Sequence, residues 1–184
     1  MALIRLSGRR ALLRACGPML VFALVLSPAC KRKVRTGATE EGAPGMASVL
    51  NMGDPKVEPQ LVTGFYGVEA GAWRWVARQF TVALRPPLGS AQKGAKLTMK
   101  LTVPQVVIDK EKNVSASAAA GGVPLAPETY TTAGDFLYVR DVPASALTGD
   151  SVRVDFQLDK AMPPMPPDIR ELGIIVLSIG LESK

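Results

Sequence analysis

The residue types that most often carry out chemistry in proteins are sparse in this chain. Among its 184 residues there are two cysteines and no histidine. Without histidine the chain lacks the commonest general base, the commonest metal ligand and every histidine-based triad. Two cysteines, Cys16 and Cys30, are too few for a four-cysteine zinc site or a disulfide scaffold. The composition therefore predicts no catalytic residue, no metal ion and no cofactor.

Carboxylates are the remaining side chains that could catalyse a reaction. The chain carries 16 acidic residues, and a pair of carboxylates about 5–10 Å apart can hydrolyse a glycosidic bond. No two of them stand in a sequence context typical of such a pair. The sequence also contains no nucleophile elbow and no glycine-rich phosphate loop before a helix. We therefore expect a protein that is not an enzyme, with an uncharacterised hydrolase as an alternative.

Other residues are suited to binding. Sugar sites commonly combine an aromatic face, which stacks on apolar C–H surfaces, with polar groups that hydrogen-bond hydroxyls. The candidate ligand-binding residues are Glu69, Trp73, Arg74, Trp75, Asp168 and Arg170, and further aromatic platforms are Tyr66, Tyr130 and Tyr138. A structural interpretation is also open, because two tryptophans two residues apart can fill a core. In that interpretation Asp168 and Arg170 fix a turn by charge-assisted hydrogen bonds, with Arg74 or Glu69 as partner.

The first 29 residues have the layout of a secretory signal peptide. An uncharged stretch over residues 15–29 follows a region without acids that contains Arg5, Arg9, Arg10 and Arg14. A basic region followed by an apolar one is typical of such signals. The apolar run is shorter than the ~20 residues that a membrane-spanning helix needs. We predict a signal peptide over 1–29, with an uncleaved N-terminal anchor as the alternative.

The end of this segment resembles the lipobox of bacterial lipoproteins. Leu26-Ser27-Pro28-Ala29-Cys30 places a small residue directly before a cysteine. In that family the cysteine thiol is acylated, so the resemblance implies lipidation of Cys30 and a membrane as partner. An alternative uses residues 27–29 as an ordinary secretion site and leaves Cys30 as a free thiol. The expected location is the cell envelope, either periplasmic or exposed at the surface.

Removal of the signal changes the charge of the chain. The whole sequence carries +6, with 22 basic against 16 acidic residues, whereas residues 36–184 hold 14 basic and 16 acidic ones. The positive excess thus belongs to the signal and to a basic collar at 31–35, and no nucleic-acid partner is expected. Residues 30–59 show no sustained apolar period, which predicts a flexible tether between the lipidated cysteine and the domain.

Residues 60–184 show the two-residue period of β-strands. The clearest alternation covers 152–159, and similar patterns cover 96–103 and 80–84. An apolar run at 172–179 predicts a central strand. Further strands are predicted at 61–67, 105–109, 113–118 and 136–140. Because no segment after the signal carries a helical apolar stripe, we predict an all-β fold with a single β-sandwich or jelly-roll domain.

The two tryptophans raise a question of register. Trp73 and Trp75 share one face of a strand, with Arg74 on the other. If both tryptophans face the core, continued alternation puts Phe80 and Val82 on the wrong side. We therefore predict a change of phase at residues 76–78, through a bulge or a tight turn.

Two motifs resemble a known module. Gly64-Phe65-Tyr66-Gly67-Val68-Glu69 followed by Trp73-Arg74-Trp75, and the ending 168–176 with its Asp-x-Arg-x-Leu-Gly turn, resemble a β-sandwich module often fused to bacterial glycosyltransferases. The resemblance implies a galactose-binding-like jelly roll. The expected function is non-catalytic recognition of envelope or surface carbohydrate. The alternative is a structural or assembly component that binds an envelope protein through a sheet edge or the proline-rich segment 162–167.

Overall fold

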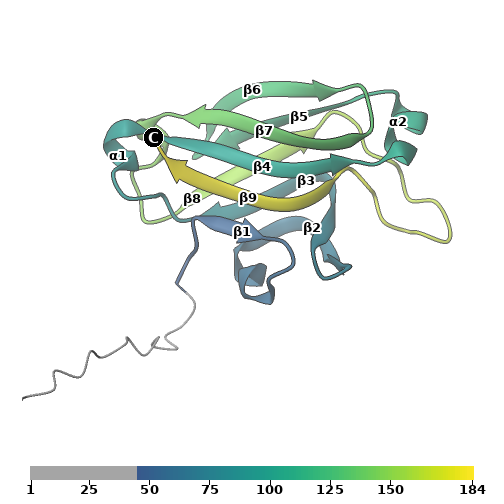
Figure 1. Ribbon diagram of the computed structural model, residues 1–184, viewed down its shortest axis with the longest axis horizontal. Coiled ribbons are helices and arrows are strands. Elements are labelled where there is room, and N and C mark those ends of the chain that lie inside the picture. Colours follow the sequence, from purple (N-terminus) through teal and green to yellow (C-terminus); the bar gives the residue numbers. More distant parts are fainter. Residues whose placement is uncertain (1–44) are drawn as a thin grey trace, which may run out of the picture. The chain divides into compact units, whose positions relative to one another are not determined.

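The computed structural model describes residues 45–184, so the predicted signal peptide and Cys30 lie outside the described residues. The described part consists mainly of antiparallel strands, with short helices between them (Figure 1). The elements are β1 (Val49–Asn51), η1 (Pro55–Gln60), β2 (Leu61–Glu69), β3 (Trp73–Leu84), α1 (Ser90–Lys93), β4 (Ala95–Val103), α2 (Gln105–Glu111), β5 (Val114–Ala120), β6 (Val123–Tyr130), β7 (Gly134–Val142), η2 (Ala144–Ala146), β8 (Val152–Leu158) and β9 (Ile175–Ser183).

The strands form the two layers of a β-sandwich. Hydrogen bonds connect them in the order β6-β5-β8-β3-β9-β4-β7, with β2 added to β3 and β1 added to β9. Between β3 and β9 the pairing covers just Arg74 with Val176 and Trp75 with Ile175. The strands therefore divide at this point into one layer of β2, β3, β8, β5 and β6 and a second layer of β1, β9, β4 and β7 (Figure 1). The predicted all-β sandwich is confirmed.

One hydrophobic core lies between the layers. The rings of Phe80 in β3 and Phe156 in β8 stack with centroids 4.8 Å apart. Tyr138 of the opposite layer meets Phe156 edge-on at 6.3 Å. Strands whose alternate residues are buried, such as β4 and β8, supply aliphatic side chains to the same cluster. This is the arrangement expected when apolar residues recur at every second position.

The phase of β3 corrects one prediction. Arg74, Val76, Phe80 and Val82 all point inward and are buried, while Trp73 and Trp75 lie on the other side and are half-buried. An irregularity is present near the predicted place, because the pairing of β3 with β2 shifts register between Val76 and Thr81. The predicted change of face is wrong, because Val76 and Phe80 are buried on the same side as Arg74. It assumed that the tryptophans must face the core, whereas the buried position is taken by Arg74, whose guanidinium finds partners inside.

Two further segments differ from expectation. Residues 105–109 form a helix, α2, instead of a strand, although Val106, Val107 and Ile108 are β-branched. Pro104 ends the ladder of β4 and directly precedes α2 as its N-cap, with extended backbone at φ −68° and ψ 149°. Its main-chain oxygen accepts from the N–H of Val107 at 3.0 Å. The apolar run at 172–179 contributes a strand that begins at Ile175 and extends to Ser183.

The sheet also begins earlier than the predicted end of the tether at residue 59. Leu50 of β1 pairs with Ile179 of β9 and is fully buried. The side chain of Gln60 donates to the main-chain oxygens of Ala47 at 3.0 Å and Ala83 at 2.7 Å, which fixes the segment to β3. The apolar residues here are too few to show a period, so the sequence pattern did not reveal them.

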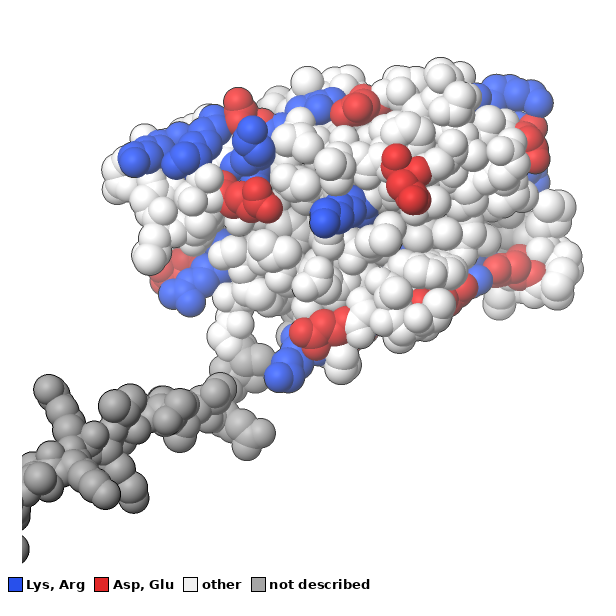
Figure 2. All heavy atoms as spheres, in the orientation of Figure 1, with Lys and Arg blue, Asp and Glu red and all other residues white. Residues whose placement is uncertain are grey.

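Charge is mixed over the face drawn in Figure 2, where lysine and arginine side chains alternate with aspartate and glutamate. Residues 45–184 hold 14 basic and 14 acidic residues. Within the described part of the chain, no helix is long and apolar enough to span a membrane.

Candidate functional site

Three of the predicted site residues meet in one ion-pair cluster. Nη2 of Arg170 lies 2.8 Å from a carboxylate oxygen of Asp168, and Nη1 lies 2.9 Å from Glu69 at the end of β2. The guanidinium also lies 5.4 Å from the centroid of the Tyr66 ring, within the range of a cation–π contact. We call Tyr66, Glu69, Asp168 and Arg170 the Arg170 clasp. It ties the loop after β8 to β2, and Glu69 is one of the two partners expected for Arg170.

The electrostatics of the clasp follow from these contacts. Hydrogen bonds from the Arg170 side chain and from its main-chain N–H lower the pKa of Asp168 from 3.8 to about 2. The hydroxyl of Tyr66 donates to the main-chain oxygen of Glu171 at 2.8 Å, which adds a second tie to the same loop. Each charged group of the clasp thus has an oppositely charged partner. Ligand contact by Glu69, Asp168 or Arg170 stays a prediction.

Arg74 occupies a separate position. Its Nε donates to the main-chain oxygen of Met52 at 3.1 Å and its Nη1 to that of Tyr66 at 3.1 Å. Its Nη2 pairs with Glu58 of η1 at 2.7 Å. These bonds join β3 to β2, to η1 and to the residue after β1. The guanidinium of Arg74 thus makes its contacts within the fold. Trp73 and Trp75 flank Arg74 on the opposite face of β3, and Trp75 packs partly against the core.

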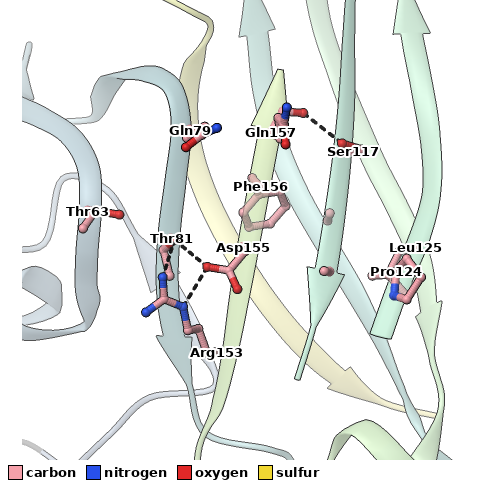
Figure 3. A pocket seen from close by; sticks show the side chains of 12 residues that line it. Thr63, Gln79, Thr81, Ser117, Pro124, Leu125, Arg153, Asp155, Phe156 and Gln157 are labelled. Atoms are coloured by element: carbon pink, nitrogen blue, oxygen red, sulfur yellow. Dashed lines mark hydrogen bonds and ion pairs between the residues drawn. The ribbon is translucent and has the colours of Figure 1, made fainter. Parts of the chain in front are cut away.

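A hollow of about 510 Å³ opens on the outer face of the layer formed by β2, β3, β8, β5 and β6 (Figure 3). We call it the sheet groove. Residues from all five strands of the layer line it: Thr63, Gln79, Thr81, Ser117, Ala118, Ala119, Pro124, Leu125, Arg153, Asp155, Phe156 and Gln157. None of the predicted binding residues is among them.

The groove exists because the outward side chains of β5 are small. The strand reads Val-Ser-Ala-Ser-Ala-Ala-Ala, and its outward positions in the groove are Ser117 and Ala119. The neighbouring strands place larger side chains on both sides, namely Gln157 on β8, which pairs with Ser117, and Pro124 on β6, which pairs with Ala119. A strand with small outward side chains between two strands with larger ones leaves an open channel on the surface of the sheet. The channel therefore requires no cavity in the core.

A closed polar network lies on one side of the groove. Oγ1 of Thr81 donates to Oδ1 of Asp155 at 2.7 Å, and Nε of Arg153 donates to the same oxygen at 2.7 Å. Nη2 of Arg153 lies 3.4 Å from the hydroxyl of Thr81, as drawn in Figure 3. Register explains the network, because Thr81 pairs directly with Asp155 across β3 and β8.

Two side-chain amides stand beside this network. Gln79 pairs with Gln157 across the same two strands, so both amides project from the same face of the sheet. Both residues are exposed, and neither amide hydrogen-bonds another side chain or main-chain group within residues 45–184. Ser117 donates to the main-chain oxygen of Gln157 at 3.1 Å. Each amide therefore offers two donors and an acceptor to a ligand.

Sequence reasoning missed the groove because it searched for aromatic and charged motifs. The available signal was a run of small residues at 115–120 next to a strand whose outward positions are Arg153, Asp155 and Gln157. Such a run indicates a depression in the surface of a sheet once the neighbouring strands are known. The order of strands, in which β5 pairs with both β6 and β8, is not evident from the sequence.

Comparison with known proteins gives similarity of structure alone. No protein-family model matches the chain, and no curated protein matches it. A solved carbohydrate-binding module, TmCBM27, described for specific mannan recognition, is 12% identical, with a TM-score of 0.45, over 76% of this chain and 97% of that one. The CBM36-1 domain of a multidomain xylanase from the hindgut metagenome of Trinervitermes trinervoides is 7% identical, with a TM-score of 0.35, over 72% and 94% of the two chains. The CBM51-2 and INT domains of Clostridium perfringens ZmpB are 11% identical, with a TM-score of 0.37, over 76% and 28%. Similarity at this level assigns no family.

Proposed function

We propose that the described domain is a non-catalytic module that binds carbohydrate in the sheet groove. The observation that carries the proposal is an open groove of about 510 Å³ in which Gln79 and Gln157 present unused amides beside the hydroxyl of Ser117 and the carboxylate of Asp155. Sugar hydroxyls donate and accept hydrogen bonds at once. Amide side chains match them because each amide also does both.

The shape of the groove suits an extended ligand. It reaches from Thr63 on β2 to Pro124 and Leu125 on β6. Neighbouring strands lie about 4.8 Å apart, so five strands span about 19 Å. Pro124, which is exposed, provides apolar surface for the C–H face of a sugar ring. Of the described lining residues Phe156 is the aromatic one, and it is buried in the core, so this site lacks the aromatic platform expected from the sequence.

The acid content of the groove supports a role without catalysis. Hydrolysis of a glycosidic bond generally uses two carboxyl groups, one on each side of the scissile bond. Of the described residues that line the groove, Asp155 is the carboxylate, and it is already paired with Arg153 and Thr81. A ligand in this groove would be bound and released unchanged.

A glycan array probed with the full chain tests the proposal. Ser117→Trp places a large side chain in the low strand and is expected to reduce binding at least about tenfold, because it fills the space that the ligand needs. Thr98→Trp is the matched control, since Thr98 sits at an outward-facing position of β4 in the opposite layer. The proposal fails if no neutral or acidic glycan binds, or if both variants bind like the unmodified chain.

We also propose that the chain is an exported lipoprotein, anchored through Cys30. The basic and apolar order of residues 1–29 and the small residue before Cys30 support this. Mass spectrometry of the N-terminal peptide is expected to show diacylglycerol on Cys30 after removal of residues 1–29. Cys30→Ser should move the protein from the membrane fraction to the soluble fraction. An unmodified Cys30 would refute the anchor and leave the groove unaffected.

A second candidate function is docking of an envelope protein on the loop between β8 and β9, which contains the proline-rich segment 162–167. Ile169 is 81% exposed and Met165 is also exposed, although the Arg170 clasp holds the loop in place. Two exposed apolar side chains on one fixed loop offer a small contact surface to a partner. A photo-crosslinker at Ile169 should then capture one protein in intact cells, whereas a crosslinker at exposed Leu88 should not. Equal labelling at the two positions would contradict docking.

A further inference from the structure

We propose that the Arg153–Asp155 pair makes the sheet groove selective for uncharged over acidic carbohydrate, which rests on the function proposed above. The two residues are the charged ones among the described residues that line the groove. Nε of Arg153 lies 2.7 Å from Oδ1 of Asp155, so the groove carries one positive and one negative charge in contact. Its net charge is zero.

The carboxylate is held in place from two sides. Oδ1 of Asp155 accepts from the hydroxyl of Thr81 as well as from Arg153. Thr81 is buried, so it cannot turn away to another partner without losing packing. Asp155 therefore presents a fixed negative charge to any ligand that enters, and its second oxygen is available to accept from a sugar hydroxyl.

The guanidinium cannot serve an acidic ligand independently of this carboxylate. Arg153 and Asp155 are two residues apart on β8 and project from the same face of the sheet. A uronate approaching Arg153 comes within a few ångströms of Asp155, and like charges at that separation repel. Both side chains also remain partly in water, with exposures of 60% and 45%, so the ligand's charge gains little from a pair that is already neutral.

The remaining lining supports the same preference. Among the described lining residues, the polar side chains without a hydrogen-bond partner include the amides of Gln79 and Gln157 and the hydroxyl of Thr63, all of which are neutral. Neutral amides hydrogen-bond hydroxyls without supplying the countercharge that a carboxylate or sulfate needs. Discrimination between neutral and acidic carbohydrate then depends on the charge balance of Arg153 and Asp155. A single substitution in this pair should change it.

Two substitutions that each remove one charge shift the balance in opposite directions. Asp155→Asn keeps an oxygen for Thr81 but leaves Arg153 without its countercharge, so the groove becomes positive. Arg153→Gln keeps a polar side chain and leaves Asp155 unbalanced, so the groove becomes negative. The measured quantity is the ratio of affinities for a neutral oligosaccharide and its uronate, because this ratio is independent of any general loss of binding.

Titration calorimetry of the full chain tests the inference with tetrasaccharides of glucose, galactose and mannose and with the same compounds oxidised at C6 to uronates. The unmodified chain is expected to prefer the neutral member by about tenfold or more. Asp155→Asn should reduce or reverse the preference, and Arg153→Gln should increase it. Raising NaCl from 50 to 500 mM should weaken these charge effects and leave neutral binding unchanged.

The outcomes separate the inference from the function beneath it. If neutral and uronate compounds bind the unmodified chain equally, or the uronates bind more tightly, selectivity through this pair is refuted while carbohydrate binding stands. If none of the compounds binds and the glycan array is also empty, the proposed function fails. If Asp155→Asn does not fold, the preference of the unmodified chain and the Arg153→Gln ratio still decide the question.

Discussion

Replacing Arg74 by methionine tests whether its buried guanidinium stabilises the part of the sandwich where β1, η1, β2 and β3 meet. The side chain of Arg74 is 7% exposed, and its bonds reach β2, η1 and the residue after β1. Methionine is unbranched, of similar length and apolar, so it can occupy the same channel. It has no donor, so the main-chain oxygens of Met52 and Tyr66 lose the partner that Arg74 supplies.

The magnitude follows from these contacts. A hydrogen bond to a charged group contributes about 1.5–3 kcal/mol net, and Arg74 makes two of them to main-chain oxygens. The ion pair with Glu58 adds at most about 1 kcal/mol, because Glu58 is 64% exposed. Methionine recovers part of this by removing the desolvation cost of a buried charge. We expect a loss of about 3 kcal/mol in the free energy of unfolding.

Urea denaturation of the purified chain, followed by tryptophan fluorescence, measures this loss. Trp73 and Trp75 lie next to Arg74 on β3 and report on the same region. Arg153→Met is the matched control, because it removes an arginine from an exposed pair and should cost less than about 1 kcal/mol. If Arg74→Met costs no more than Arg153→Met, the buried bonds of Arg74 do not stabilise this edge and the reasoning is refuted.

Four other substitutions can be checked with the same denaturation assay. Tyr130→Phe should raise the free energy of unfolding by about 1 kcal/mol because its buried hydroxyl has no partner in the described part of the chain, and Tyr138→Phe should lower it by a similar amount because its hydroxyl donates a bond at 2.8 Å. Gly64→Ala should cost at least about 2 kcal/mol, since Gly64 has a φ of +79° and a Cβ would collide with the backbone of β3. The pKa of Asp168 is lowered to about 2 by Arg170, so its stabilising effect is present above its ordinary value of 3.8 and is lost as the pH falls towards 2. The difference between the unmodified chain and Asp168→Asn should therefore shrink from pH 5 to pH 2, and a constant difference would contradict the ion pair.

Local patterns in the sequence were enough to predict most strands. The alternation at 96–103 and 152–159 matches β4 and β8 closely, because each strand buries every second side chain against one core. Where a segment is short or its period is broken, the same reasoning did not work. The three residues of β1 are too few to show a period, and the β-branched residues of α2 resemble a strand unless Pro104 before them is taken as the end of β4.

The candidate functional residues likewise fall into a group that the sequence predicted and a group that it did not. The sequence identified Glu69, Asp168 and Arg170 as groups able to pair, and the structure joins them across 101 positions of the chain between Glu69 and Arg170. The groove was not visible, because it depends on which strands become neighbours. Gln79 and Gln157 become opposite partners through the register of β3 on β8.

The amino-acid sequence by itself determined the chemistry available to this protein: no histidine, polar side chains alternating with apolar ones, and a cysteine behind an export-like leader. Tertiary structure alone decided which polar groups were used internally and which stayed available. Arg74 turned inward and donates to main-chain oxygens, while Gln79 and Gln157 came to lie opposite each other in a groove that the small residues of β5 leave open. The physical reason is that hydrogen-bond satisfaction and surface shape depend on neighbours across the sheet, and pairing between distant strands is fixed by the packing of the whole core.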